Sequence, residues 1–213
     1  RSKVSNLNSD QLWSYEIPLK LVLLDSKKFL CRTFADYFSN LPNVEIVHGT
    51  IEELSFFDCV VTGASSVASA NNVDASTLKF FGEDVEKLLQ KRIQDLYLGE
   101  QPIGTSLILE TNHALYPFIA HTPSLRMQMS IAGKDHVYQA IWSTLLAIRQ
   151  HNKLYNSSLQ NQINIVAIPG LGTSFGNIPV DEVARQMSMA YQNFLFSVQP
   201  IQSSSQQQFH NSL

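Results

Sequence analysis

The chain has 213 residues, of which 44% are hydrophobic and 15% are charged, and its formal net charge is −3. This length and apolar content suffice for one domain with a substantial core. The acidic balance, without a basic run longer than two residues, argues against nucleic acid as a partner. No stretch approaches the roughly 18 apolar residues that a membrane span requires. We therefore expect a cytoplasmic protein with no membrane partner.

The two cysteines and the two ends of the chain set further expectations. Cys31 and Cys59 lie in apolar stretches without a C-x-x-C partner, which indicates buried free thiols rather than a disulfide framework or a zinc site. We expect no metal and no cofactor. The polar residues 1–15 are predicted to form a loose arm and the Ser/Gln-rich residues 201–213 a disordered tail, which leaves one folded domain over 16–200.

Apolar runs alternate with stretches of helical periodicity along almost the whole chain. The sequence predicts strands at 19–24, 44–47, 57–61, 107–109, 118–120 and 165–168. Helices are predicted between Asp25 and Pro42, at 80–96 with an interruption around Gly82, at 134–151, and from about residue 179. The two strands on either side of Ala114 allow antiparallel pairing. The pattern therefore predicts a three-layer α/β/α sandwich with a mixed, mostly parallel six-stranded sheet.

A glycine-rich loop follows the last predicted strand and precedes the last helix. Gly170, Gly172 and Gly176 allow the main chain to approach a ligand closely, and Thr173 and Ser174 add hydroxyl groups. The loop lacks the lysine of the P-loop and does not spell G-x-G-x-x-G. It is a candidate phosphate-binding loop at the carboxyl end of a strand, and a connection without a ligand is the alternative.

A second loop of small residues follows the strand predicted at 57–61. Residues 62–66 read T-G-A-S-S, and residues 70–74 read A-N-N-V-D. The loop therefore offers a second strand end with polar and small side chains. Ligands in open α/β sheets collect at such strand ends.

Two segments resemble a known family. The sequence P-G-L-G-T-S-F-G-N-I-P at 169–179, with A-R-Q-M at 184–187, resembles the diphosphate loop and following helix of the macro domain, an ADP-ribose-recognising module. The sequence A-H-T-P-S-L-R-M at 120–127 is similar to a strand-end segment of its bacterial and phage-type branch. The resemblance covers about residues 44–195. It implies an α/β/α fold whose partner is ADP-ribose or an ADP-ribosylated protein.

The resemblance also implies a set of ligand-binding residues. Backbone N–H groups of the 172–176 loop would bind the diphosphate, and the loop over 61–74 would form the opposing wall. The implied ligand-binding residues are Thr50, Ile51, Gly63, Ala64, Ser66, Asn71, Asn72, Val73, Gly170, Leu171, Gly172, Thr173, Ser174, Phe175 and Gly176.

The chain departs from the family pattern at three places. Thr50 stands where the family has an aspartate that accepts a hydrogen bond from the adenine amino group, a type of bond that contributes on the order of 1.5–3 kcal/mol. Ser65 stands where the family has the asparagine that orients the distal ribose. Asn71 and Asn72 replace two glycines, in a loop that is one residue shorter. Asparagine adopts positive φ more readily than most residues, so the turn is compatible with it, but a close approach of the backbone to the ligand is less favourable there.

Asp74 matches the acidic position that activates water at C1″ of the distal ribose in hydrolytic members of the family. With Ser65 positioning the ribose or the water, it would make the chain an ADP-ribosyl hydrolase or an O-acetyl-ADP-ribose deacetylase. The alternative is that Asp74 caps a helix starting near Ala75. His113 and His121 lie near predicted strand ends, where each is either a residue of the cleft or an ordinary hydrogen-bonded histidine.

Three functions therefore stay open at this point. The first is binding of ADP-ribose or a related nucleotide diphosphate between the 61–74 and 169–179 loops. The second is hydrolysis with Asp74 as the general base. The third is a degenerate macro fold with a different ligand or a protein-interaction role, which the substitutions at Thr50, Ser65 and Asn71-Asn72 favour.

The hydrolytic hypothesis makes one direct prediction. Asp74→Ala removes the proposed base and is expected to lower the release of ADP-ribose from an ADP-ribosylated protein by about 100-fold or more. The release is measured by chromatography of the free nucleotide. Full turnover in the variant would exclude Asp74 as the base.

Overall fold

The computed structural model describes residues 19–63, 80–126, 130–155, 158–171, 173 and 177–198. The strands are β1 (Lys20–Asp25), β2 (Val44–His48), β3 (Cys59–Thr62), β4 (Leu107–Glu110), β5 (Phe118–His121) and β6 (Ile165–Pro169). The α-helices are α2 (Lys28–Phe38), α4 (Glu83–Tyr97), α5 (His136–Leu154) and α6 (Val180–Val198), and short 3₁₀ helices lie at η1 (Ile51–Glu53) and η2 (Leu159–Asn161). Across these ranges no helix is long and apolar enough to cross a membrane.

The strands form one sheet in the order β2-β1-β6-β3-β5-β4. The pairs from β2 through to β5 are parallel, and β4 runs antiparallel to β5 with Leu107 opposite His121 and Glu110 opposite Phe118. The short connection around Ala114 permits this hairpin-like pairing, because antiparallel neighbours need no crossover helix. The predicted mixed, mostly parallel six-stranded sheet is confirmed.

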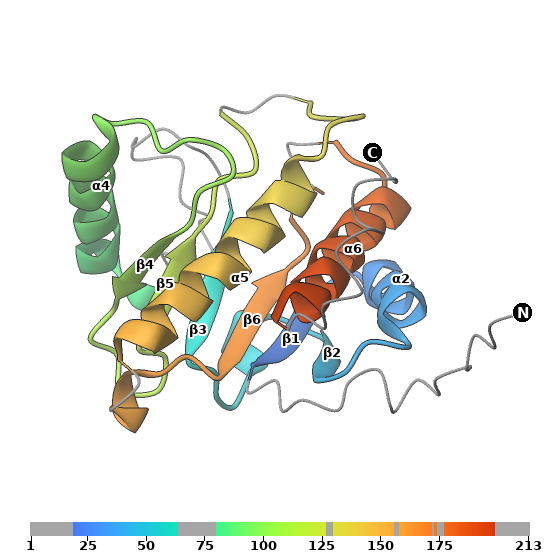
Figure 1. Ribbon diagram of the computed structural model, residues 1–213, viewed down its shortest axis with the longest axis horizontal. Coiled ribbons are helices and arrows are strands. Elements are labelled where there is room, and N and C mark those ends of the chain that lie inside the picture. Colours follow the sequence, from blue (N-terminus) through green and yellow to red (C-terminus); the bar gives the residue numbers. More distant parts are fainter. Residues whose placement is uncertain are drawn as a thin grey trace, which may run out of the picture.

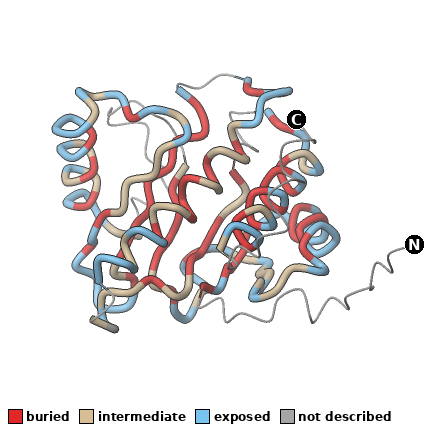
Figure 2. The backbone as a smooth tube through the Cα atoms, viewed as in Figure 1, coloured by how far each residue is buried: buried red, intermediate tan, exposed pale blue. Residues whose placement is uncertain are grey.

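Helices cover both faces of the sheet. α2, α5 and α6 lie on one face, and α4 packs on the other, toward the β4 side (Figure 1). Successive strand residues point to opposite faces, so Val61 and Ala120 join the core under α2, α5 and α6, whereas Val60 and Ile119 join the core under α4. The strands are largely buried while the outer helix surfaces are exposed (Figure 2). The three-layer α/β/α architecture follows from this alternation.

One element boundary differs from the sequence prediction, and one predicted interruption is confirmed. β3 begins at Cys59 rather than at Phe57, because Phe57 is buried through stacking on Tyr116, with ring centroids 4.2 Å apart, and not through strand pairing. α4 begins at Glu83, after Gly82 adopts a φ of 86° at the N-cap position. Only glycine adopts this φ readily, and Phe80 and Phe81 before it are also helical, so the predicted interruption at Gly82 is confirmed.

The two cysteines are buried and free, as predicted. Cys59 lies in β3 within the core, and its burial raises the pKa of its thiol. A thiol with a raised pKa carries little thiolate at neutral pH and is a poor nucleophile or metal ligand. Cys59 therefore acts as a small apolar core residue.

Asp58 connects the beginnings of three neighbouring strands. Its Oδ2 atom accepts hydrogen bonds from the backbone N–H groups of Asn164, at 2.7 Å, and Ile165, at 2.8 Å. Its own N–H donates to the Ile165 carbonyl at 2.9 Å, and its carbonyl accepts from the Phe118 N–H at 3.0 Å. One residue thus aligns the starts of β6, β3 and β5.

We predict that Asp58→Ala lowers the free energy of unfolding by about 3 kcal/mol, because two backbone N–H groups lose a charged acceptor. Urea denaturation followed by circular dichroism measures the change. Asp95→Ala is the matched control, since Asp95 forms an exposed pair with Lys91 on α4, and pairs of this kind contribute less than about 1 kcal/mol. Equal stability of the two variants would contradict the role given to Asp58.

Candidate functional site

The two loops singled out in the sequence leave adjacent strands at the same edge of the sheet. β3 and β6 are parallel neighbours, with Cys59 opposite Val166 and Val60 opposite Ala167. The chain therefore leaves β3 into Gly63 and β6 into Gly170 side by side. β1, β2 and β5 run in the same direction, so their carboxyl ends share this edge. Ligands of open α/β sheets bind at such an edge.

The structure describes part of the predicted set of site residues. Thr50, Ile51, Gly63, Gly170, Leu171 and Thr173 all follow the carboxyl ends of β2, β3 or β6. The predicted site residues outside the described part of the chain are Ala64, Ser65, Ser66, Asn71, Asn72, Val73, Asp74, Gly172, Ser174, Phe175 and Gly176.

The first residues of the two loops are in direct contact. Leu171 is buried, with 4% of its surface exposed, and its side chain lies over Gly63. A Cβ atom on Gly63 would lie 2.7 Å from Cδ2 of Leu171 and 3.2 Å from the Thr122 carbonyl oxygen. The first distance is too short for two carbon atoms that are not bonded to each other. Glycine at 63 therefore makes room for Leu171. The buried side chain of Leu171 is therefore not available to a ligand.

Gly170 is required by packing on the other side of β6. A Cβ atom at this position would collide with the side chain of Leu30 on α2 and approach Oδ2 of Asp25 to 2.9 Å. The Gly170 carbonyl accepts a hydrogen bond from the Thr173 hydroxyl at 3.3 Å, which closes the start of the loop. The sequence prediction gave Gly170 a role at the ligand, and close packing is a second reason for glycine here.

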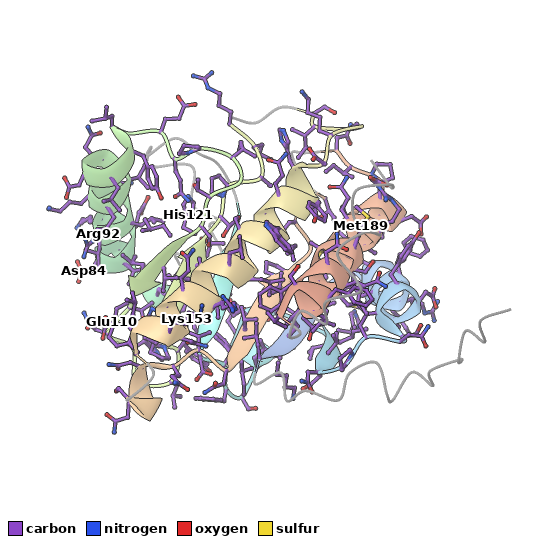
Figure 3. The ribbon with its side chains drawn as sticks, in the orientation of Figure 1. Asp84, Arg92, Glu110, His121, Lys153 and Met189 are labelled. Atoms are coloured by element: carbon purple, nitrogen blue, oxygen red, sulfur yellow. The ribbon has the colours of Figure 1, made fainter. Side chains whose placement is uncertain are left out.

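Polar groups from the β5 end support the first residues of the β3 loop. The Ser124 hydroxyl donates to the Gly63 carbonyl at 3.0 Å, and the Thr122 N–H donates to the Thr62 carbonyl at 2.8 Å. His121 is buried at the end of β5 (Figure 3), and its Nδ1 lies 3.1 Å from Oγ1 of Thr62. His121 therefore lies at the site edge, by which we mean the edge of the sheet where the carboxyl ends of β1, β2, β3, β5 and β6 meet. There it positions Thr62, directly before the loop.

A buried polar network anchors the segment after β5 to α5. The Thr122 hydroxyl lies 2.7 Å from the Ser106 hydroxyl and 2.9 Å from the Thr144 hydroxyl on α5. Gln101 is fully buried and donates to the His121 carbonyl at 3.0 Å. Buried polar groups that are hydrogen-bonded rigidify their surroundings. The sequence reasoning missed this network, because isolated Gln, Ser and Thr residues carry no spacing signal.

His113 lies at the opposite edge of the sheet. It follows β4, and β4 is antiparallel to β5, so the end of β4 points away from the site. The His113 ring stacks on Tyr116 with centroids 4.9 Å apart and an interplanar angle of 24°, and Phe80 packs beside both. His113 therefore belongs to an aromatic cluster and not to the site edge.

The segment after β2 places a carboxylate at the site edge that the sequence prediction did not include. Glu53 closes the 3₁₀ turn η1, and its Oε2 accepts a hydrogen bond from the Thr50 N–H at 2.7 Å. The T-x-x-E spacing is that of a capping box and could have signalled this arrangement. Ile51 is buried beneath the turn, whereas Thr50 and Glu53 are exposed.

Ionic and amide groups fix the start of α6, the helix that follows the glycine-rich loop. Glu182 accepts hydrogen bonds from Arg185 and Gln186, and these bonds, chiefly those from Arg185, lower the pKa of Glu182 to about 2. Gln186 also donates to the Lys134 carbonyl at 2.8 Å and accepts from the Tyr138 N–H at 3.0 Å. The beginnings of α5 and α6 are thereby joined. The described ranges contain no group of three or more His, Cys, Asp or Glu that could hold a metal ion.

We predict that Gly63 and Leu171 are energetically coupled. Leu171→Ala alone should cost about 2–5 kcal/mol of unfolding free energy through the cavity it leaves, and Gly63→Ala about 1–3 kcal/mol through overpacking. In the double variant the new methyl group occupies part of the vacated space, so its cost should fall short of the sum by about 1 kcal/mol. Denaturant unfolding of the four proteins tests this, and strict additivity would show that the contact carries no coupling.

Solved structures with a similar fold are macrodomains. The macrodomain of Mycobacterium tuberculosis DarG is 18% identical, with a TM-score of 0.54 over 68% of this chain and 88% of that chain. The macrodomain of Oceanobacillus iheyensis with MES bound is 17% identical, with a TM-score of 0.54 over 70% and 75% of the two chains. The macrodomain of Thermus aquaticus DarG is 17% identical, with a TM-score of 0.52 over 68% and 87%.

At these identities the structural similarity establishes the fold alone. A search of curated proteins found no match. The family model of the macro domain matches residues 61–187, which run from the end of β3 into α6 and include both loops of the site edge. Because this match spans more than half of the chain, the chain belongs to the macro domain family.

Proposed function

We propose that this chain binds ADP-ribose, or a related nucleotide diphosphate, between the 61–74 and 169–179 loops. One observation carries the proposal: β3 and β6 are adjacent parallel strands, and Leu171 packs over Gly63 where their two loops begin. The loops therefore begin at a fixed distance from each other, as the two walls of a binding site require. Membership of the macro domain family supplies the ligand class.

Backbone donors suit the diphosphate part of such a ligand. The loop between Gly170 and Pro179 leads directly into α6, and the N-terminus of a helix carries a partial positive charge and unpaired N–H groups. Glu182 lies in the first turn of α6, and Arg185 pairs with its carboxylate. This pairing reduces the repulsion that Glu182 would otherwise exert on an anion near the helix start.

The structural support concerns binding rather than catalysis. The proposed catalytic residues Asp74 and Ser65 lie outside the described residues, and their roles stay predictions from the sequence. The scaffold beneath them is described: Ser124 and Thr122 hold the backbone of Gly63 and Thr62. Binding is therefore the function that the geometry supports best.

Isothermal titration with ADP-ribose tests the proposal, with AMP, ADP and ribose-5-phosphate as partial ligands. We expect saturable binding with a Kd in the micromolar range, which corresponds to about −8 kcal/mol. Each partial ligand lacks one end or the diphosphate, so each should bind more weakly than ADP-ribose. Absence of heat with all four ligands, from protein shown to be folded, would overturn the proposal.

Gly172→Glu probes the diphosphate loop within the same assay. The added carboxylate repels an anion and fills space in the loop, so the affinity for ADP-ribose should fall by about tenfold or more. Gln192→Glu is the matched control, because it adds the same charge at an exposed position of α6 beyond its first turns. Equal affinity of Gly172→Glu and the control would place the ligand elsewhere.

A further inference from the structure

Leu98 ends α4 in a backbone conformation that disfavours leucine. Its φ is 54° and its ψ is 30°, in the left-handed region where a Cβ atom is strained. The Leu98 N–H donates to the Gln94 carbonyl at 3.1 Å, and the Gly99 N–H donates to the Ile93 carbonyl at 3.2 Å. These two bonds close a Schellman motif, in which glycine is the usual residue at the position of Leu98. In this chain the glycine comes one residue later.

The side chain of Leu98 does not stabilise the fold. It is 89% exposed, and Leu96, two residues earlier, is 56% exposed. In a Schellman motif an apolar contact often joins the residue after the left-handed position to the last turn of the helix, but here that residue is Gly99, which has no side chain. Leucine at position 98 is therefore strained and buries little apolar surface within the chain. Departures of this kind from local preference are expected where a residue has a functional role.

The C-terminal end of α4 lies at the site edge. Gln101, three residues after Leu98, is buried and donates to the His121 carbonyl at 3.0 Å. Glu100 pairs with Arg126, which follows β5, with Oε1 and Nε 2.6 Å apart. The end of α4 thus lies toward the carboxyl ends of the parallel strands (Figure 1). A polypeptide attached to a ligand at this edge reaches Leu98 within a few residues, because an extended chain spans about 3.3 Å per residue.

Arg92 adds a cation to the same part of α4 (Figure 3). It lies one turn before Leu96, so the two side chains share a face of the helix. The Arg92 side chain is exposed and forms no ion pair within the part of the chain that the structure describes. The neighbouring Lys91, in contrast, is paired with Asp95 at 2.8 Å. An unpaired guanidinium beside exposed leucines complements a partner that carries carboxylates next to apolar side chains.

We propose that Leu96, Leu98 and Arg92 form a docking surface for the polypeptide that carries the ADP-ribose, and that this surface selects acidic, apolar sequences around the modified residue. The proposal rests on the proposed function, because a ligand bound at the site edge brings its polypeptide to α4. The nucleotide is the same in every modified protein and cannot distinguish one from another. Contacts at the end of α4 belong to the polypeptide alone and supply this discrimination.

Titration calorimetry compares free ADP-ribose with two peptides of equal length that carry ADP-ribose on the central residue, through a linkage that is stable to hydrolysis. One peptide has leucine and glutamate around the modified residue, and the other has serine and lysine at the same positions. We expect the leucine-glutamate peptide to bind the wild-type chain about tenfold or more tightly than free ADP-ribose does. The serine-lysine peptide should bind within about twofold of free ADP-ribose.

Leu98→Asn should reduce the gain of the leucine-glutamate peptide to about twofold or less and leave the affinity for free ADP-ribose unchanged. Because asparagine adopts the left-handed conformation more readily than leucine, this variant should also raise the melting temperature by about 2 °C or more. Leu154→Asn is the matched control and should keep the gain, since Leu154 is 80% exposed at the last residue of α5. Arg92→Glu should transfer the gain to a peptide with leucine and lysine.

The outcomes distinguish the two proposals. If the folded wild-type chain binds neither free ADP-ribose nor either peptide, the proposed function is overturned and the docking surface with it. Binding of free ADP-ribose with equal affinities for the two peptides overturns the docking surface alone, as does a gain that Leu98→Asn retains. A lower melting temperature of Leu98→Asn would show that Leu98 stabilises the fold, and would also count against the docking surface. A gain that is lost in Leu98→Asn, kept in Leu154→Asn and transferred by Arg92→Glu supports it.

Discussion

The pairing of β6 on both of its sides is the constraint on which the rest of the structure depends. β6 lies between β1 and β3, and the carboxylate of Asp58 receives the backbone N–H groups of Asn164 and Ile165 where β6 begins. The starting register of β6 against β3 then determines where the strand ends, at Pro169. Everything beyond that point, including the contact of Leu171 with Gly63, is positioned by a polar interaction at the opposite edge of the sheet.

At the site edge, side chains and backbone have different roles. Buried side chains such as Leu171, Thr122 and His121 fix the strand ends, whereas the proposed diphosphate contacts come from main-chain N–H groups. Such a site tolerates changes in ligand-facing side chains as long as the supporting contacts remain. The departures from the family pattern at Thr50, Ser65 and Asn71-Asn72 fit this division. The family fold thus persists although residues of the proposed site differ from the family pattern.

Much of the fold could be predicted from the sequence, because continuous apolar runs such as 165–168 and helical periodicity report burial directly. The boundary at Phe57 could not, since burial by aromatic stacking has the same apolar signature as burial in a strand. In the site, glycine positions were visible, but their partners were not: Gly63 and Leu171 are far apart in sequence and meet only through strand order. The Glu53 turn is encoded locally by T-x-x-E, so this capping contact could have been predicted from the sequence.

The central place of β6 also bears on how the chain folds. β6 follows all of its partner strands in the sequence, and the register pairs Lys20 with Ile165 across most of the folded chain. Before β6 docks, β2-β1 and β3-β5-β4 are two separate half-sheets, each with an unpaired central edge that can pair wrongly with another chain. Contacts between residues so distant in sequence form slowly. During synthesis the sheet therefore closes only after residue 169 has been made, and the site edge assembles only after that point.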